Sequence, residues 1–197
     1  MRKLIQKAVK ILNSGGIVIF PTDTAFGIGC RIDMLQSVVR LFELKKRPLN
    51  QAVPVLASDL AMAEKYLLSP LPNNVRRLMN DYWPGALTVI YKAKPDKISP
   101  PVAGVDQTLG IRIPNHDLIL KVIRQAGVPL LGPSANFHGK PTPYKTEDLD
   151  TKLTGKVDLV IGGKCPLKQA STVIDCSKSP WKIVRQGSVT VDERQYQ

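Results

Sequence analysis

The chain has 197 residues, of which 43% are hydrophobic and 22% charged, as in an ordinary globular protein. No apolar run approaches the roughly 20 residues that a membrane-spanning helix needs, and the N-terminus has no signal-peptide pattern. We therefore expect a cytoplasmic protein without membrane contact. Lysine and arginine (28) outnumber aspartate and glutamate (16), so the net charge is +12. This excess predicts an anionic partner such as a nucleotide, RNA or acidic lipid, unless the protein is merely basic.

Helical and extended patterns alternate from the start of the chain. Apolar residues recur at helical spacing over residues 4–12. The apolar run at residues 17–20 then predicts a buried strand, and a polar loop follows it. Asp33 is expected to cap the next helix, with the cations of residues 45–47 in its last turn and Pro48 ending it.

The rest of the chain continues this alternation. Pro54 indicates that the strand at residues 53–57 is an edge or irregular strand. Further helices are predicted at residues 59–67, 73–82 and 117–126, and further strands at residues 86–91, 108–113, 128–131, 159–161, 171–175 and 183–185. The last strands follow one another without helices. The prediction is a single α/β domain over residues 1–197, with a twisted, mixed parallel and antiparallel sheet flanked by helices.

Several common site motifs are absent from the sequence. The three cysteines are widely separated, so neither a disulfide framework nor a zinc site is expected. Residues 162–165 lack the upstream glycine and the hydroxyl of a phosphate-binding loop, and residues 27–32 carry only two glycines of a dinucleotide fingerprint. The two histidines have no local support for a metal site or a catalytic triad. No protein-held metal is predicted.

Four polar clusters lie where strands or helices end, which is where α/β folds bind ligands. They are residues 21–27, 45–48, 132–136 and 171–175, the last with Arg185 downstream. Their hydroxyl, amide and cationic groups suit phosphate or carboxylate oxygens. Three of them also have an ordinary structural interpretation: a polar turn at residues 21–27, a solvated basic helix end at residues 45–48, and an Asp175–Arg185 pair between strands. The cluster at residues 132–136 is a short motif that is weak alone.

Taken in order, these clusters resemble the YrdC/TsaC family of threonylcarbamoyl-AMP synthases. The family pattern reads roughly P-T-[ED]-T-x-[YF]-G-x-G, K-x-R-P, W-P-G-x-L-T, G-x-R-x-P, P-S-A-N-x-S-G, S-T-V-[VI]-D and [IV]-x-R-x-G. Matching segments are residues 21–29, 45–48, 83–88, 110–114, 133–139, 171–175 and 183–187. One motif alone is weak, whereas seven in order are specific.

The resemblance implies that a carbamate of threonine, made with bicarbonate or carbon dioxide, attacks the α-phosphate of ATP and releases pyrophosphate. Other proteins would then transfer the threonylcarbamoyl group to the adenosine beside the anticodon of tRNA. Mg²⁺ is expected through the phosphates, with few protein ligands. By motif, the catalytic set is Lys45, Arg47, Ser134 and Asn136; ATP contacts are Lys45, Arg47, Gln51, Thr108, Ser134, His138 and Arg185; threonine contacts are Thr24, Leu56, Arg112, Asn136 and Ser171.

The sequence departs from the family pattern at a few positions. Phe26 replaces the commoner tyrosine, Ala52 and Val53 replace Pro-Leu, and His138 stands where a serine is usual. The length fits the short, single-domain type. Two alternatives remain open: a diverged regulatory member, and a module that binds tRNA or double-stranded RNA without synthase activity.

Overall fold

The computed structural model describes residues 1–104 and 107–196. Three short 3-10 turns, at Pro95–Lys97, Thr146–Asp148 and Glu193–Gln195, accompany the regular elements. The helices and strands follow in the order α1 (Arg2–Asn13), β1 (Val18–Phe20), β2 (Gly27–Gly29), α2 (Leu35–Lys45), β3 (Val55–Leu56), α3 (Leu60–Glu64), α4 (Asn73–Tyr82), β4 (Leu87–Lys92), β5 (Thr108–Arg112), α5 (Asp117–Ala126), β6 (Leu130–Leu131), α6 (Thr151–Thr154), β7 (Leu159–Val160), β8 (Thr172–Asp175) and β9 (Lys182–Arg185).

The strands form two sheets, one of six strands in the order β6-β3-β5-β4-β8-β9 and one of three in the order β2-β1-β7. The β3–β5, β4–β8 and β1–β7 pairs are parallel, and the other neighbours are antiparallel. Isolated bridges from Gly27 to Ser134 and from Arg31 to Leu130 join the edge of one sheet to the edge of the other. The predicted mixed sheet is confirmed.

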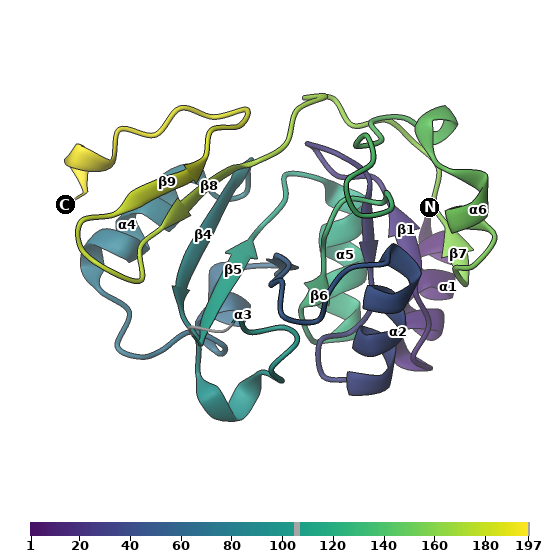
Figure 1. Ribbon diagram of the computed structural model, residues 1–197, viewed down its shortest axis with the longest axis horizontal. Helices are drawn as coiled ribbons and strands as arrows, with labels where there is room; N and C mark the ends of the chain where they lie inside the picture. The colour runs from purple at the N-terminus through teal and green to yellow at the C-terminus, as the bar shows by residue number, and fades with distance from the viewer. Residues whose placement is uncertain (105–106, 197) are drawn as a thin grey trace.

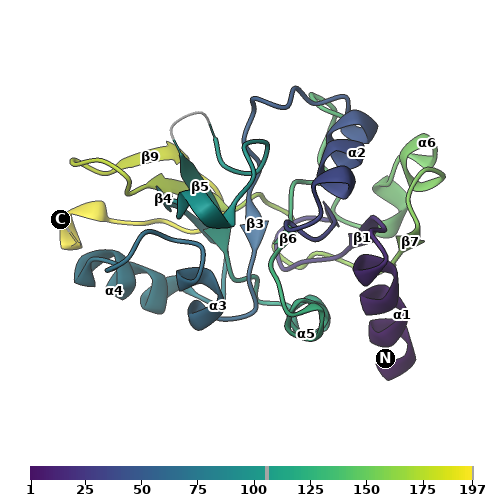
Figure 2. The ribbon, with the colours of Figure 1, turned by 90° about the horizontal axis from the view of Figure 1, so that it is seen from below.

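Helices cover both sides of this arrangement. Figure 2 shows α1, α5, α3 and α4 along one side, and α2 with the segment that follows it on the opposite side. In Figure 1, β4, β8 and β9 lie at one end of the molecule, and α1, α6 and β7 lie at the other. No helix in the described residues is long and apolar enough to cross a membrane.

Apolar periodicity explains how α1 and α5 pack. On α1 the residues at helical spacing, Ile5, Ala8 and Leu12, are buried, and they pack with the equally amphipathic α5. Arg31 ties the two helix ends together, because its Nη1 donates to Asn13 Oδ1 at 2.6 Å and to the Ala126 carbonyl at 2.9 Å. The two helices therefore end side by side.

The predicted ends of α2 were wrong. Asp33 does not cap the helix, because Arg31 holds its carboxylate through bonds of 2.8 and 3.0 Å. The helix begins at Leu35, without a side-chain cap. At the other end only Lys45 is helical, and Lys46 adopts a left-handed conformation with φ 53°. The chain reverses there, so Arg47 leaves the helix before Pro48 is reached.

The irregular strand expected at residues 53–57 agrees with β3, which spans only Val55–Leu56, but the alternative of an edge strand is wrong, and one strand was not predicted. The segment at residues 53–57 is not at an edge, because β3 lies between β5 and β6, and the Pro54 carbonyl accepts from the Gly132 amide at 2.8 Å. The glycines of residues 27–29 form strand β2, which sequence reasoning missed. A Cβ on Gly29 would lie 2.3 Å from the Leu131 carbonyl oxygen, so only glycine fits where the sheets meet.

Candidate active site

One cavity of about 450 Å³ opens between the ends of the strands and the segments after α2 and β6. Eight of the twelve residues predicted from the sequence line it, namely Thr24, Arg47, Leu56, Thr108, Arg112, Ser134, Ser171 and Arg185. The other four, Lys45, Gln51, Asn136 and His138, are not part of its lining. Among the described residues, the lining carries three guanidinium groups and several hydroxyls, but no carboxylate, histidine or cysteine. Such a cavity suits an anionic ligand.

Arg112 forms one wall of the cavity from the end of β5. Its side chain is nearly buried, with 5% of its surface exposed. Nε donates to the Gly85 carbonyl at 2.8 Å, Nη1 donates to Thr24 Oγ1 at 2.6 Å, and Nη2 pairs with Asp23 Oδ1. Burial lowers the pKa of Arg112, while the Asp23 carboxylate acts in the opposite direction. The guanidinium is therefore fixed in orientation and remains a cation, since arginine pKa values lie so high.

Ser171 joins two other strands to the same cavity. Its hydroxyl lies 2.9 Å from Thr88 Oγ1 on β4, and Arg185 Nη2 donates to it at 3.1 Å. Arg185 also donates to the Ser171 carbonyl through Nε and Nη2, at 3.0 and 2.9 Å. The register places Arg185 opposite Val173, so the structural interpretation of an Asp175–Arg185 pair is wrong.

Arg47 borders the cavity from the segment that follows α2. Its Nε donates to the Gln51 carbonyl at 3.1 Å, and its Nη2 donates to the Ala52 carbonyl at 3.0 Å. Burial lowers the pKa of this guanidinium. The Arg47 side chain thus closes the loop of residues 47–52, and Ala52 is part of the lining. Gln51 contributes only its backbone carbonyl to these bonds, and its side chain is exposed.

Lys45 lies behind the cavity wall and does not form part of the lining. It is 2% exposed, and its Nζ donates to the Ser134 carbonyl at 2.5 Å and to the Asn136 carbonyl. Ser134 Oγ in turn donates to Asn136 Oδ1 at 2.6 Å. Burial, with a smaller contribution from the nearby Arg47 charge, lowers the pKa of Lys45 to about 8. The ammonium group therefore holds the loop of residues 133–136 from its protein side.

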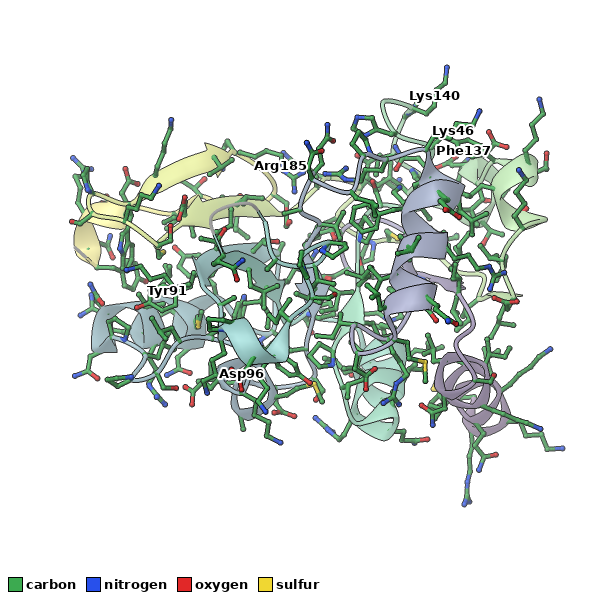
Figure 3. All side chains as sticks on the ribbon, turned by 60° about the horizontal axis from the view of Figure 1, so that its bottom comes forward. Lys46, Tyr91, Asp96, Phe137, Lys140 and Arg185 are labelled. Atoms are coloured by element: carbon green, nitrogen blue, oxygen red, sulfur yellow. The ribbon has the colours of Figure 1, made fainter. Side chains whose placement is uncertain are left out.

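His138 and its neighbours lie outside the cavity. The His138 amide donates to the Lys45 carbonyl at 2.9 Å, and the side chain is exposed. Figure 3 shows Lys46, Phe137 and Lys140 gathered nearby, with Lys46 Nζ 5.9 Å from the centroid of the Phe137 ring. The serine-to-histidine departure at position 138 therefore leaves the cavity lining itself unchanged.

Comparison with known proteins places the chain in a family. A family model described as telomere recombination, Sua5/YciO/YrdC, matches residues 10–187. The chain belongs to the Sua5/YciO/YrdC family. It is 37% identical over 193 residues to the threonylcarbamoyl-AMP synthase of Bacillus subtilis, covering 96% of this chain and 55% of that protein. The corresponding enzyme of Stenotrophomonas maltophilia is 34% identical over 161 residues, covering 81% of this chain and 86% of the relative.

Solved structures of the family have the same fold. Pyrococcus abyssi Sua5 complexed with L-threonine superposes with a TM-score of 0.88 at 28% identity, covering 97% of this chain and 56% of that chain. Escherichia coli YciO gives 0.88 at 27% identity, covering 98% of this chain and 93% of the other. The chain spans about half the length of the Bacillus and Pyrococcus relatives. These comparisons confirm the Sua5/YciO/YrdC fold. They also confirm the family resemblance that the seven motifs predicted.

Sequence reasoning overlooked some residues in or beside the cavity. Thr88 belongs to the Trp83–Thr88 motif, which carried a resemblance but no assigned role, and its hydroxyl pairs with Ser171. Asp23 stood in the first motif, yet its pairing with Arg112 was not anticipated. Thr142, a further hydroxyl of the lining, follows the fifth motif without belonging to it. The motifs held a signal for Thr88 and Asp23 but none for Thr142.

Proposed function

We propose that this chain is a threonylcarbamoyl-AMP synthase, a nucleotidyltransferase that uses L-threonine, bicarbonate or carbon dioxide, and ATP. The observation that carries the proposal is a single cavity bordered by Arg47, Arg112 and Arg185, in a chain 37% identical to an enzyme of that name. A carbamate and a triphosphate are both anions. A site that brings them together needs fixed donors to offset their repulsion and the charge that builds on phosphorus.

Arg47, Arg185 and Ser134 are the groups that we assign to the phosphates of ATP. Both arginines are held by protein carbonyls, so their remaining N–H groups are oriented before the ligand arrives. In the proposed step, a carbamate oxygen attacks the α-phosphorus and the bond to the bridging oxygen of pyrophosphate breaks. Thr108, also in the lining, is a further proposed ATP contact.

Threonine is assigned to the part of the cavity around Arg112. Three of the five N–H groups of this guanidinium have acceptors among the described residues, which leaves two for a carboxylate. The hydroxyls of Thr24 and Ser171 and the apolar side chain of Leu56 line the same cavity. They offer hydrogen bonds to the hydroxyl of threonine and contact to its methyl group.

Lys45 and Asn136 are proposed to act from behind the lining. Lys45 binds the carbonyls of Ser134 and Asn136, and Asn136 accepts from the Ser134 hydroxyl. In this arrangement Lys45 fixes the position of the Ser134 hydroxyl for phosphate binding. Gln51 and His138, which lie outside the lining, carry no proposed side-chain role in the resting site.

Mg²⁺ and the macromolecular partners belong to the same proposal. The described residues contain no cluster of three or more His, Cys, Asp or Glu side chains, and the cavity lining offers only neutral oxygens and arginines. These residues fit a metal ion that enters on the ATP phosphates rather than one held by the protein. The product would pass to proteins that transfer the threonylcarbamoyl group to tRNA.

The proposal is tested by pyrophosphate release, with threonine and bicarbonate each omitted in turn and serine as a substitute amino acid. Release should require both and be weak with serine. In the same assay Arg47→Ala should lower turnover by about 10²-fold or more, the scale of losing one electrostatic donor. Lys46→Ala removes a neighbouring exposed charge and is the matched control, with turnover near that of wild type. Equal turnover of Arg47→Ala and wild type would remove Arg47 from the site.

A further inference from the structure

Two buried polar atoms near Arg112 have no hydrogen-bond partner in the part of the chain that the structure describes. They are Oδ2 of Asp23 and Nδ1 of His116. Buried polar atoms of folded proteins are nearly always paired, because an unpaired atom keeps the full cost of its desolvation. An unpaired acceptor and an unpaired ring nitrogen in the same part of the molecule therefore call for a common explanation.

Asp23 and His116 reach the surroundings of Arg112 from different segments. Asp23 follows β1 and pairs with Arg112 Nη2 through its other carboxylate oxygen, Oδ1. His116 follows Arg112 by four residues, in the turn between β5 and α5. Burial lowers the pKa of His116 and the Asp23 carboxylate acts in the opposite direction, so the imidazole lies within range of that charge. Neither residue lines the cavity, so both can act on a ligand only through Arg112.

Backbone hydrogen bonds hold both residues in place. The Leu167 amide donates to the Asp23 carbonyl at 2.9 Å. The His116 amide donates to the Pro114 carbonyl at 3.0 Å, and the His116 carbonyl accepts from the Leu120 amide at 3.1 Å in the first turn of α5. The freedom that remains is rotation of the two side chains, which is what bringing Nδ1 and Oδ2 together requires.

Three ordinary roles do not account for this histidine. His116 occupies the N-cap position of α5, yet its side chain makes no cap hydrogen bond. Within residues 1–104 and 107–196, no group of three or more His, Cys, Asp or Glu side chains could hold a metal ion. Cys165, which also interacts with the Asp23 charge, is not a nucleophile to be activated, since burial raises its pKa to about 11. None of these roles uses Nδ1.

We propose that His116 is a positioning residue, which donates its Nδ1–H to Asp23 Oδ2 when a carboxylate binds to Arg112. This inference rests on the proposed function, which assigns the carboxylate of threonine to Arg112. An incoming carboxylate shares the guanidinium with Asp23 and adds a second negative charge beside it. A donor on the free oxygen of Asp23 stabilises that arrangement and keeps Asp23, and hence the plane of the Arg112 guanidinium, in position.

The position of the donor atom makes the inference specific. Nδ1 of histidine and the amide nitrogen of asparagine are each two bonds from Cβ, so H116N can place a donor at the same point. Leucine has the branched shape of asparagine but no donor. H116N and H116L are therefore a matched pair that separates the hydrogen bond from the space that the side chain fills.

The test is binding of L-threonine to the full chain, measured by isothermal titration calorimetry, with a non-hydrolysable ATP analogue as the second ligand. In H116L the Kd for threonine should rise about 10-fold or more, as expected for a lost hydrogen bond to a charged group, and the Kd for the ATP analogue should stay within about twofold. H116N should bind threonine within about threefold of wild type, because it keeps the donor. N115A changes an exposed neighbour in the same turn and should alter neither affinity.

Four results would contradict the inference. Equal threonine affinity of H116L and wild type would show that Nδ1 is not needed. Equal losses in H116L and H116N, both shown by thermal unfolding to be folded, would mean that the ring is required and the donor is not. A matching loss of affinity for the ATP analogue would indicate a general disturbance of the site. Failure of the wild-type chain to bind threonine would overturn the proposed function, and this inference with it.

Discussion

At the scale of single residues, the buried pair of Arg112 and Asp23 explains how a cation is kept ready inside the protein. An isolated guanidinium at 5% exposure would cost several kcal/mol, and the Asp23 carboxylate offsets much of that cost. The same pairing fixes the plane of the guanidinium, so its two remaining N–H groups keep one direction. A ligand carboxylate can then bind without first ordering the side chain.

Replacing Arg112 should therefore affect threonine more than ATP. Arg112→Lys keeps a cation beside Asp23 but loses the planar fork, and we expect the KM for threonine to rise about 10-fold or more with the KM for ATP nearly unchanged. Steady-state kinetics with each substrate varied in turn would measure both. A rise in the KM for ATP alone would contradict the assignment of Arg112 to threonine.

Lys45 gives a second prediction, because its pKa of about 8 lies close to working pH. As pH rises through about 8 the ammonium group loses its proton, and its bonds to the Ser134 and Asn136 carbonyls weaken. The KM for ATP should rise over this range in wild type and in Lys46→Ala. In Lys45→Met it should already be high and should not change with pH.

The effect of Lys45 deprotonation on the free energy of unfolding distinguishes the loss of these local bonds from unfolding of the protein. The folded pKa of Lys45 is below its ordinary value of 10.5, so between about pH 8 and 10.5 the unfolded chain binds the proton more than the folded chain. Stability from this group alone rises with pH across that range. A loss of ATP affinity that coincided with unfolding, measured by urea denaturation at each pH, would count against the positioning role.

At the scale of elements, the junction of β2 with β6 places the loop of residues 133–136. The Ile28 amide donates to the Pro133 carbonyl at 2.9 Å, and the Leu131 amide donates to the Cys30 carbonyl at 2.9 Å. Gly29 lies at the closest approach of the two backbones. Its lack of a side chain therefore controls the position of Ser134, which follows the start of β6 at Leu130 by four residues.

Gly29→Ala should accordingly destabilise the protein by about 1–3 kcal/mol, because the backbone at Leu131 must move. The matched control is Gly110→Ala in β5, where a Cβ would meet its neighbours at ordinary distances of 3.6 to 3.9 Å. Free energies of unfolding in urea would compare the two. Equal effects of the two substitutions would show that the junction tolerates a side chain.

Element prediction succeeded where apolar periodicity was strong and failed where tertiary contacts decide. The helices at residues 73–82 and 117–126 were predicted with the bounds that α4 and α5 have. The cap at Asp33 failed because Arg31 competes for its carboxylate. Strand β2 was missed because the need for glycine at position 29 comes from the edge of the other sheet, where Leu131 lies 102 residues further along the chain.

At the scale of the whole molecule, the motifs predicted which residues gather but not how each one is used. Eight of the predicted residues line one cavity, although they come from segments spread over residues 24–185. Lys45 could not be placed from sequence, because its position depends on carbonyls 89 and 91 residues away in the chain.

The most direct test of the central claim is the product itself. The chain is incubated with ATP, L-threonine and ¹³C-bicarbonate, and the products are separated and identified by mass spectrometry. The account predicts one new adenylate that carries one threonine and one labelled carbon, formed together with pyrophosphate and absent when threonine is omitted. AMP and pyrophosphate without a labelled adenylate, in protein shown to be folded, would contradict it.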